Sequence, residues 1–347
     1  MVDLPLISVG VIALNEEQTL PAILGDIATQ DYPHRKIQIV LVDSGSTDTT
    51  PLLMCSFAEN YPDFAGVEVL DNPKKIQPAG WNVVFTAARG SVVVRLDAHA
   101  RIPADFISNV VQVLSEGENV VGGLRPTTVP EGAAPWQHTL LAAEDSLFGA
   151  SIAHYRGGDS DVAAEHDGKD EVPKYVKSVF HPAYRREVID EVGLFDERLV
   201  RTEDNDYSYR VRQAGYKIRF DHRIRSQQLI RPTLRLMAKQ KYANGYWVGR
   251  TLFIQPCCIE VYHLVPAAFV TALVGAGMLA LGGKKLPAKL LGGAYGVAAG
   301  AMAVAGAATA SHRHWSLIAL PVIFPILHIA YGIGTWKGIM GGLFKKL

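Results

Sequence analysis

The sequence lacks several features that would assign it to a common class of protein. Its 347 residues carry 34 Lys and Arg against 34 Asp and Glu, so it has no formal net charge. Without a basic excess, a general nucleic-acid-binding protein is not favoured. Three cysteines, two of them adjacent (Cys257 and Cys258), are too few for a disulfide framework or a zinc cluster. An apolar content of 48% argues against a disordered chain.

Three motifs of common enzyme families are also missing. No G-x-G-x-x-G follows a predicted strand, and neither G-x-x-x-x-G-K-[ST] nor G-x-S-x-G occurs. Their absence argues against a dinucleotide-binding enzyme, a P-loop enzyme and a hydrolase with a nucleophile elbow.

Acidic residues are absent after Glu260, where long apolar runs begin. Tyr262–Leu281, Leu290–Ala310 and Trp315–Trp336 contain no Asp, Glu, Lys or Arg. Each is about the ~20 residues that a membrane-spanning helix needs, so we expect about three spans. The second run is rich in Gly and Ala, which suits close helix packing in lipid. Three buried helices of a soluble protein are the alternative, but no amphipathic partners remain to surround them.

Basic residues are concentrated just before the first run. They indicate either a solvated face or, as we favour, a collar at the anionic cytoplasmic leaflet. The cations in question are Arg223, Arg225, Arg231, Arg235, Lys239, Lys241 and Arg250. The N-terminus has no basic segment before its apolar run, so no signal peptide is expected. We therefore expect a multi-pass protein of the cell (inner) membrane with a cytoplasmic N-terminal domain.

The lysines of the tail conflict with a simple three-span topology. An odd number of spans would put Lys337, Lys345 and Lys346 outside, against the positive-inside rule. One segment is then re-entrant or interfacial, and the Gly- and Ala-rich second run is the first suspect.

The first 125 residues alternate between β-branched apolar runs and helical stretches. The predicted strands are Leu6–Leu14, Ile37–Val42, Val67–Leu70 and Ser91–Leu96, and the predicted helices cover 15–27, 46–60 and 77–88. This order predicts an α/β fold with a mostly parallel sheet and right-handed crossovers.

Polar residues follow the predicted strands at the edge where ligands of parallel sheets bind. Asn15 and Glu17 follow the first strand, Asp43 the second, and Asp97 and His99 the fourth. D-x-H is a weak signal alone, but a carboxylate and an imidazole at a strand end suit Mn²⁺ well and Mg²⁺ acceptably. Such an ion would neutralise a diphosphate leaving group.

A second polar cluster covers 201–206 and precedes a helix predicted over Tyr207–Ala214. Acidic residues are also common where a helix begins, so the cluster alone does not establish a site.

Five motifs in this order resemble the family 2 inverting glycosyltransferases of the GT-A fold. They are V-x-A-L-N-E-E at 11–17, V-D-S-G-S-T-D-T-T at 42–50, D-A-H at 97–99, G-L-F-D-E at 193–197 and T-E-D at 202–204. D-A-H in place of D-x-D is similar to the exopolysaccharide branch typified by succinoglycan glucosyltransferases. The resemblance covers about residues 1–260 and implies a Rossmann-like sheet with helices on both faces, followed by the membrane helices.

The resemblance also implies roles for individual residues. Asp204 would be the general base, with Glu203 beside it in the catalytic pair. Asp97 and His99 would bind Mg²⁺ or Mn²⁺. The nucleotide-sugar would be bound by Leu14, Asn15, Glu17, Asp43, Gly80, Asn82, Asp97 and Ala98.

The implied function is transfer of one sugar from a nucleotide-sugar, with UDP-hexose favoured, to a lipid-linked or glycan acceptor in cell-surface polysaccharide synthesis. Membrane lipids are expected partners and nucleic acid is not. Processive relatives carry Q-x-x-R-W, whereas here Gln240 is followed by Lys-Tyr-Ala-Asn, which favours single-sugar transfer. The alternatives are a polyprenyl-phosphate glycosyl synthase and a non-catalytic membrane scaffold that only binds nucleotide-sugars.

The expected organisation is a catalytic domain over 1–230, a basic interfacial segment over 231–260 and a transmembrane region over 261–347. Residues 156–171, which are polar and Gly-rich, are expected to form a surface loop or a lid over the donor or acceptor.

Overall fold

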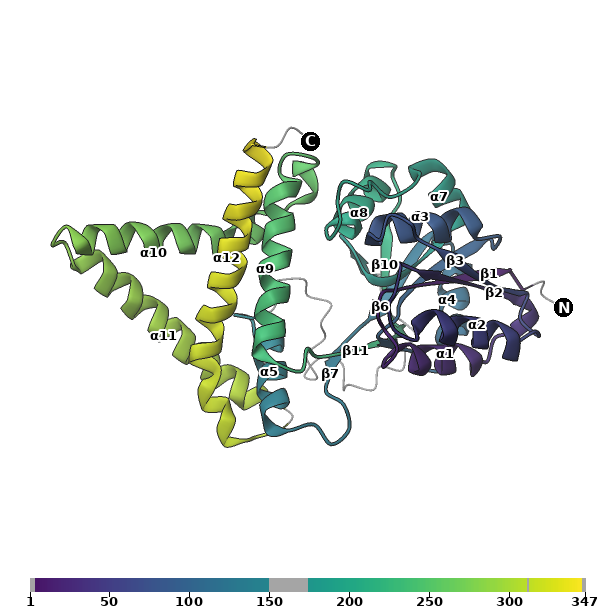
Figure 1. Ribbon diagram of the computed structural model, residues 1–347, viewed down its shortest axis with the longest axis horizontal. Helices are drawn as coiled ribbons and strands as arrows, with labels where there is room; N and C mark the ends of the chain where they lie inside the picture. The colour runs from purple at the N-terminus through teal and green to yellow at the C-terminus, as the bar shows by residue number, and fades with distance from the viewer. Residues whose placement is uncertain (1–3, 150–173, 311, 345–347) are drawn as a thin grey trace. The chain divides into compact units, whose positions relative to one another are not determined.

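The computed structural model describes residues 4–149, 174–310 and 312–344, which fall into two compact units (Figure 1). The first unit contains the described residues of 1–126 and 155–228, and the second those of 127–154 and 229–347. The expected catalytic domain ended near residue 230. Instead, the chain first enters the second unit at residue 127, returns to the first unit over 155–228, and enters the second unit again at 229.

An eight-stranded sheet forms the centre of the first unit, in the order β3-β2-β1-β4-β9-β6-β10-β8. β1 pairs in parallel with β2 and β4, β2 with β3, and β6 with β10, whereas β9 and β8 run antiparallel to their neighbours. A two-residue strand, β5, pairs with β11 outside this sheet. The strands of the unit are β1 Ile7–Ala13, β2 Ile37–Asp43, β3 Gly66–Asp71, β4 Val92–Asp97, β5 Ala100–Arg101, β6 Val120–Leu124, β8 Lys174–Val176, β9 Phe180–Arg185, β10 Ile218–Arg225 and β11 Gln227–Leu229.

Helices cover both faces of this sheet, as predicted (Figure 1). α1, α2 and α4 pack on one face, and α3, α7 and α8 pack on the other. Alternate residues of β4 serve the two layers: Val92, Val94 and Leu96 join one core, and Val93 joins the other. The helices are α1 Leu20–Ala28, α2 Thr50–Asn60, α3 Gln77–Ala87, α4 Phe106–Ser115, α7 Arg186–Val192 and α8 Glu203–Gln213.

The four predicted strands match β1 to β4 within a few residues, because short runs rich in Val and Ile favour strands. The first helix was expected from residue 15 but begins at Leu20. Asn15 adopts a left-handed conformation (φ 55°), so the chain turns before it can become helical.

The second unit is helical and contains the long apolar segments. Within the described residues, three helices are long and apolar enough to cross a membrane, at Val261–Leu281, Leu286–Thr309 and Trp315–Phe344. These positions match the three predicted runs. The elements of the unit are β7 Thr127–Thr128, α5 Pro135–Asp145, α9 Leu234–Thr251, α10 Val265–Leu281, α11 Leu286–Thr309 and α12 Leu320–Phe344.

Two rows of glycine allow α9 and α12 to touch along their backbones; the two helices lie side by side in Figure 1. A methyl group built on Gly245 or Gly249 of α9 would lie 2.1 Å from the Tyr331 carbonyl oxygen or 2.2 Å from that of Thr335. Reciprocally, Gly334 and Gly338 of α12 face the carbonyls of Tyr242 and Tyr246. Small residues four apart permit this approach, as in packed membrane helices.

The Gly-rich second run was expected to pack closely, and this expectation is wrong for most of its glycines. A methyl group on Gly292, Gly293, Gly296 or Gly300 of α11 would meet no atom within 4 Å in the described part of the chain. Only Gly306 of this helix has neighbours at van der Waals distance. The close contacts belong to α9 and α12 instead.

Three basic side chains that we expected at the membrane surface bond to other groups of the protein instead. Arg223 bonds to Asp221 and Glu116. Lys241 pairs with Glu144 at 3.5 Å, and Arg250 donates to the Gly341 carbonyl at 2.6 Å. A basic collar would therefore rest on fewer residues than the sequence suggested.

The α9–α12 contact predicts that Gly245→Ala destabilises the protein. The added methyl group cannot be accommodated without moving a helix backbone, and overpacking of this kind costs about 1–3 kcal/mol. Gly300→Ala is the matched control, since it adds the same group to a helix at an open position and should be neutral or slightly stabilising. Thermal unfolding of both variants in detergent measures the difference. Equal midpoints would contradict the close approach of α9 and α12.

Candidate active site

The carboxyl edge of the sheet brings the predicted polar residues together. In the strand register, Asp43 of β2 lies opposite Ala13 of β1, and Asp97 of β4 lies opposite Ile12. The two aspartates therefore end β2 and β4, the two neighbours of β1, at nearly the same level. This is the position where ligands of parallel sheets bind.

Asn15, Glu17 and Asp43 connect two loops at this edge. The Asp43 carboxylate accepts the backbone N–H groups of Gly45 (3.0 Å) and Ser46 (3.1 Å). Asn15 Oδ1 accepts the N–H of Thr47 at 2.8 Å, and Glu17 accepts that of Thr49 at 3.2 Å. The loops after β1 and β2 thus form one rim, from which the Leu14 side chain stands exposed. Direct binding of a nucleoside by these residues stays a prediction.

Asp97 is the best-defined anionic group of the edge. Its side chain is about one-third exposed (31%), and its Oδ2 lies 3.2 Å from Nε2 of the buried His181. Burial alone would raise the pKa of Asp97, but the hydrogen bond with His181 and nearby positive charge, including Arg125, outweigh burial and hold that pKa well below its usual range. Asp97 is therefore ionised at neutral pH.

His99 lies beside Asp97 but already has neighbours at both ring nitrogens. Its Nδ1 is 3.5 Å from a Glu16 oxygen, and its Nε2 is 3.1 Å from the Gln228 side-chain nitrogen. Ala98 between the two predicted ligands is buried. Sequence reasoning did not identify Glu16 or Gln228 here, because neither belongs to the D-A-H motif.

The edge fits a divalent cation that is shared with a diphosphate. Within the described residues, no group of three His, Cys, Asp or Glu stands ready to enclose a metal. Mg²⁺ needs no such enclosure, since it commonly binds one or two carboxylates and takes its other ligands from phosphate and water. Asp97, ionised and partly exposed, meets that requirement, and His99 would have to release one neighbour to join it.

A buried arginine lies under the acidic cluster. Arg95 precedes Asp97 by two residues on β4, so both side chains point to the same face of the sheet. Its guanidinium carbon is 4.3 Å from the ring centre of Trp81 and 4.7 Å from that of Phe195. Burial raises the pKa of both Glu203 and Asp204, and the positive charge of Arg95 makes this rise smaller.

Glu203 and Asp204 begin α8 but occupy different environments. Glu203 is buried, and its Oε2 has no hydrogen-bond partner in the described residues. Burial, followed by the charge of Asp204, raises the pKa of Glu203 well above its ordinary value. An enclosed carboxyl is out of reach of an acceptor hydroxyl, so this placement argues against a direct catalytic role for Glu203.

Asp204 is exposed, and its Oδ1 accepts the N–H of Asn205 at 2.8 Å. Desolvation by the surrounding protein raises the pKa of Asp204 despite the charge of Arg95. Because one side is open to water, we expect a smaller rise than for Glu203. An exposed carboxylate with a raised pKa suits a general base.

Gly80 and Asn82 of α3 lie within the fold. A methyl group on Gly80 would be 3.2 Å from Ile12 of β1, so this glycine allows close helix packing. The buried Asn82 side chain bonds to both the N–H (2.8 Å) and the carbonyl (3.1 Å) of Phe195. These bonds fix the G-L-F-D-E segment before the acidic cluster. A direct contact of either residue with the donor stays a prediction.

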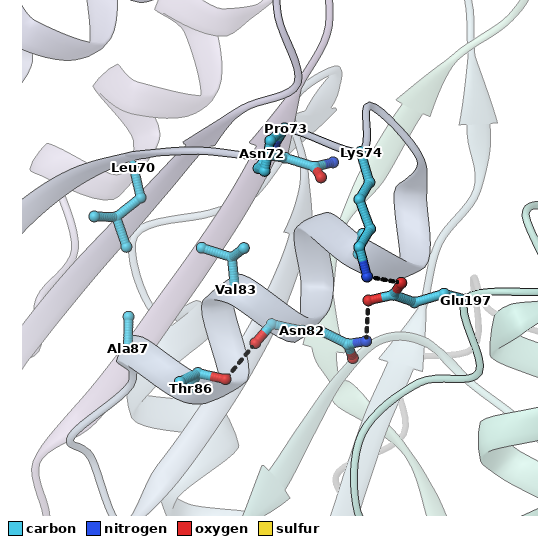
Figure 2. A pocket seen from close by; sticks show the side chains of 10 residues that line it. Leu70, Asn72, Pro73, Lys74, Asn82, Val83, Thr86, Ala87 and Glu197 are labelled. Atoms are coloured by element: carbon cyan, nitrogen blue, oxygen red, sulfur yellow. Dashed lines mark hydrogen bonds and ion pairs between the residues drawn. The ribbon is translucent and has the colours of Figure 1, made fainter.

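Figure 2 shows a pocket of about 390 Å³ along α3. Leu70, Val83 and Thr86 line it, and Glu197 closes it through contacts with Lys74 and Asn82. Asp97 and the other acidic residues of the strand ends do not contribute to its lining, but the predicted donor-binding residue Asn82 does. Asn72, which also lines it, donates its backbone N–H to the Asp43 carbonyl at 2.7 Å, so the pocket adjoins the Asp43 side of the edge. The predicted loop 156–171 lies outside the described residues.

Comparison with known proteins agrees with this arrangement. Residues 8–192 match the family described as glycosyl transferase family 2. The chain is 30% identical over 208 residues to the succinoglycan biosynthesis protein ExoA of Rhizobium meliloti (strain 1021), covering 59% of this chain and 57% of that protein. It is 34% identical over 125 residues to an undecaprenyl-phosphate 4-deoxy-4-formamido-L-arabinose transferase of Aeromonas hydrophila, covering 35% and 38%. The chain thus spans less than two thirds of either relative.

A solved structure extends the comparison to the fold. The mannosyltransferase PcManGT from Pyrobaculum calidifontis, in complex with GDP-Man and Mn²⁺, superposes with a TM-score of 0.62 at 20% identity. The match covers 96% of this chain and 87% of that one. The predicted GT-A fold is confirmed.

The burial of Glu203 predicts how Glu203→Gln changes the pH dependence of stability. Below pH 4.5, the ordinary pKa of the group, it is protonated in both folded and unfolded chains. As pH rises above that value, the unfolded chain loses the proton while the buried group keeps it, so the wild type loses stability. The Gln variant lacks this loss and should gain stability relative to wild type with rising pH. Unfolding midpoints measured at a series of pH values, beginning below 4.5 and extending above neutrality, test this. A constant difference would mean that Glu203 is ionised in the fold.

Proposed function

Because this chain belongs to glycosyl transferase family 2, we propose that it moves a single sugar from a nucleotide-sugar to a lipid-linked or glycan acceptor in cell-surface polysaccharide synthesis. UDP-hexose is the favoured donor, and transfer inverts the configuration at the anomeric carbon. The observation that carries the proposal is one pair of carboxylates. Asp97 is ionised at the end of β4, and Asp204 is exposed nearby with a raised pKa to which the charge of Asp97 contributes.

Different residues of the edge would perform different parts of the reaction. Asp43 and the rim formed by the loops after β1 and β2 support the nucleoside. Asp97, with His99, would hold a divalent cation that the diphosphate shares. When bound, Mg²⁺ or Mn²⁺ neutralises the charge that develops on the departing diphosphate. Asp204 accepts the proton of the acceptor hydroxyl as that oxygen attacks the anomeric carbon.

The apolar helices of the second unit support a membrane location. They would anchor the enzyme in the cell (inner) membrane, where a lipid-linked acceptor is presented. Arg231, Arg235 and Lys239 precede the first candidate span and favour a cytoplasmic catalytic unit.

A polyprenyl-phosphate glycosyl synthase is the second candidate, favoured by the similarity to the undecaprenyl-phosphate transferase. In that case the acceptor is the lipid phosphate itself. A scaffold without activity is less compatible with the chain, because both Asp97 and Asp204 are present.

Turnover with a panel of nucleotide-sugars and a membrane lipid extract tests the proposal. We expect one donor to be used and one sugar to be added with inverted anomeric configuration. A lipid-monophosphate sugar as the product would select the second candidate. Binding of a nucleotide-sugar without any transfer would support a scaffold.

Removal of divalent cations should abolish transfer. Without a cation the two phosphates of the donor would lie unneutralised beside Asp97, which disfavours both binding and departure of the diphosphate. Transfer should stop in excess chelator and return on addition of Mn²⁺ or Mg²⁺. Undiminished turnover in chelator would refute the metal role of Asp97.

Asp204→Asn should abolish most of the transfer while leaving donor binding intact. The substitution removes the proton acceptor and little else, so kcat should fall by ~10²–10⁴-fold with a small change in donor KM. Steady-state kinetics measure both values.

Asp105→Asn is the matched control, an exposed aspartate before another helix, α4. Asn caps a helix about as well as Asp, so a merely structural Asp204 would behave like this control. Turnover of Asp204→Asn within about threefold of wild type, far below the loss expected of a general base, would remove that role.

A further inference from the structure

A buried histidine contacts Asp97 without a role in the proposed reaction. We propose that His181 is a positioning residue: held by Ser226, its imidazole donates Nε2–H to one oxygen of Asp97 and thereby presents the other oxygen to the divalent cation. This inference rests on the proposed metal site at Asp97.

Three distant segments of the chain build this arrangement. His181 comes from β9, Asp97 from the end of β4, and Ser226 follows β10. His181 Nδ1 lies 2.8 Å from Ser226 Oγ, and His181 Nε2 lies 3.2 Å from Asp97 Oδ2. The His181 side chain is 4% exposed, and Ser226 is also buried. Both ring nitrogens are thus bonded within the protein, which leaves neither for a metal.

The chemistry of these partners determines which nitrogen carries the proton. Asp97 is acceptor-only when ionised, so Nε2 must carry a hydrogen for the 3.2 Å contact to be favourable. In the neutral ring Nδ1 is then an acceptor, and the Ser226 hydroxyl can donate to it. Asp97 therefore sets the tautomer, and Ser226 holds the orientation of the ring. Carboxylates that bind metals are commonly oriented by such hydrogen bonds.

The backbone at His181 is strained in a way that aims the ring at Asp97. β9 and β6 pair at Ala183 with Val121 and at Phe180 with Gly123, so β9 has one extra residue between these pairs. Such bulges redirect a side chain. His181 adopts a left-handed conformation (φ 45°), although it precedes Pro182 and such residues favour extended backbone. Strain of this kind is retained where surrounding structure enforces it, often at functional sites.

The affinity of the full-length protein for Mn²⁺ in the presence of UDP, with GDP in parallel, tests the proposal. Electron paramagnetic resonance of free Mn²⁺ measures it in detergent, independently of turnover. His181→Asn should weaken Mn²⁺ binding by about 10–100-fold, the range for loss of such a supporting bond. Asn tolerates the left-handed backbone but is too short to reach Asp97. His181→Gln, whose amide can reach Asp97, should recover part of the affinity, and Ser226→Ala should fall between wild type and His181→Asn.

Kinetics supply a second measurement, the Mn²⁺ concentration that gives half-maximal transfer. This concentration would not change if His181 had only a structural role. His181→Asn should need more Mn²⁺ for half-maximal transfer, while kcat at saturating Mn²⁺ stays close to wild type. If His181→Asn fails to fold, Ser226→Ala and His181→Gln carry the test through the same two measurements.

Asp97→Asn separates failure of this inference from failure of the proposed function. If Asp97→Asn loses Mn²⁺ binding and the folded His181 and Ser226 variants bind within about twofold of wild type, well short of the expected loss, His181 does not position Asp97. If Asp97→Asn itself binds Mn²⁺ normally, the metal site is elsewhere and both ideas fall.

Discussion

The acidic end of the sheet depends on one buried cation, the Arg95 guanidinium. It lies between the rings of Trp81 on α3 and Phe195 before α8, so a single side chain joins the helix layer to the strand that carries Asp97. A buried charge of this kind is unfavourable unless opposite charge or aromatic faces compensate it. Asp97, Glu203 and Asp204 supply negative charge or the capacity for it, and Arg95 in turn limits the rise that burial causes in the pKa of Glu203 and of Asp204. The cluster therefore tolerates several carboxyl groups in a small volume.

This arrangement places adjacent carboxyl groups in different environments. Glu203 and Asp204 are consecutive residues of one helix, and their side chains point about 100° apart. Glu203 enters the core, where burial raises its pKa, while Asp204 faces water. Because side chains alternate along a strand, Arg95 and Asp97 of β4 lie on the same face of the sheet. The guanidinium therefore lies next to the residue proposed to bind the metal. The bulge of β9 then adds His181 from the neighbouring strand.

Much of the fold follows from the sequence, whereas much of the site's support does not. β1 to β4 were predictable because each is a short run dominated by β-branched and other apolar residues, and the last three helices because each is a long apolar run. The strand-end aspartates followed from the positions of the strands. The sequence alone could not place His181 beside Asp97. Its contact spans 84 positions in the chain and depends on an antiparallel strand between β4 and β6. Likewise, composition identified α11 as glycine-rich, but only the packing shows that the glycines of α9 and α12 meet backbone. Asn82 belongs to a donor-binding motif by resemblance, yet its side chain holds Phe195.

We propose above all that the edge formed by Asp97 and Asp43 binds a metal and the diphosphate of a nucleotide-sugar. Anomalous diffraction from crystals of the protein grown with Mn²⁺ and UDP would locate both. We expect one manganese peak within about 2.0–2.3 Å of an Asp97 oxygen, the range for oxygen ligands of hard divalent cations, with nucleotide density extending towards Asp43. A manganese peak bound by other residues, or nucleotide density in the pocket along α3, would contradict it.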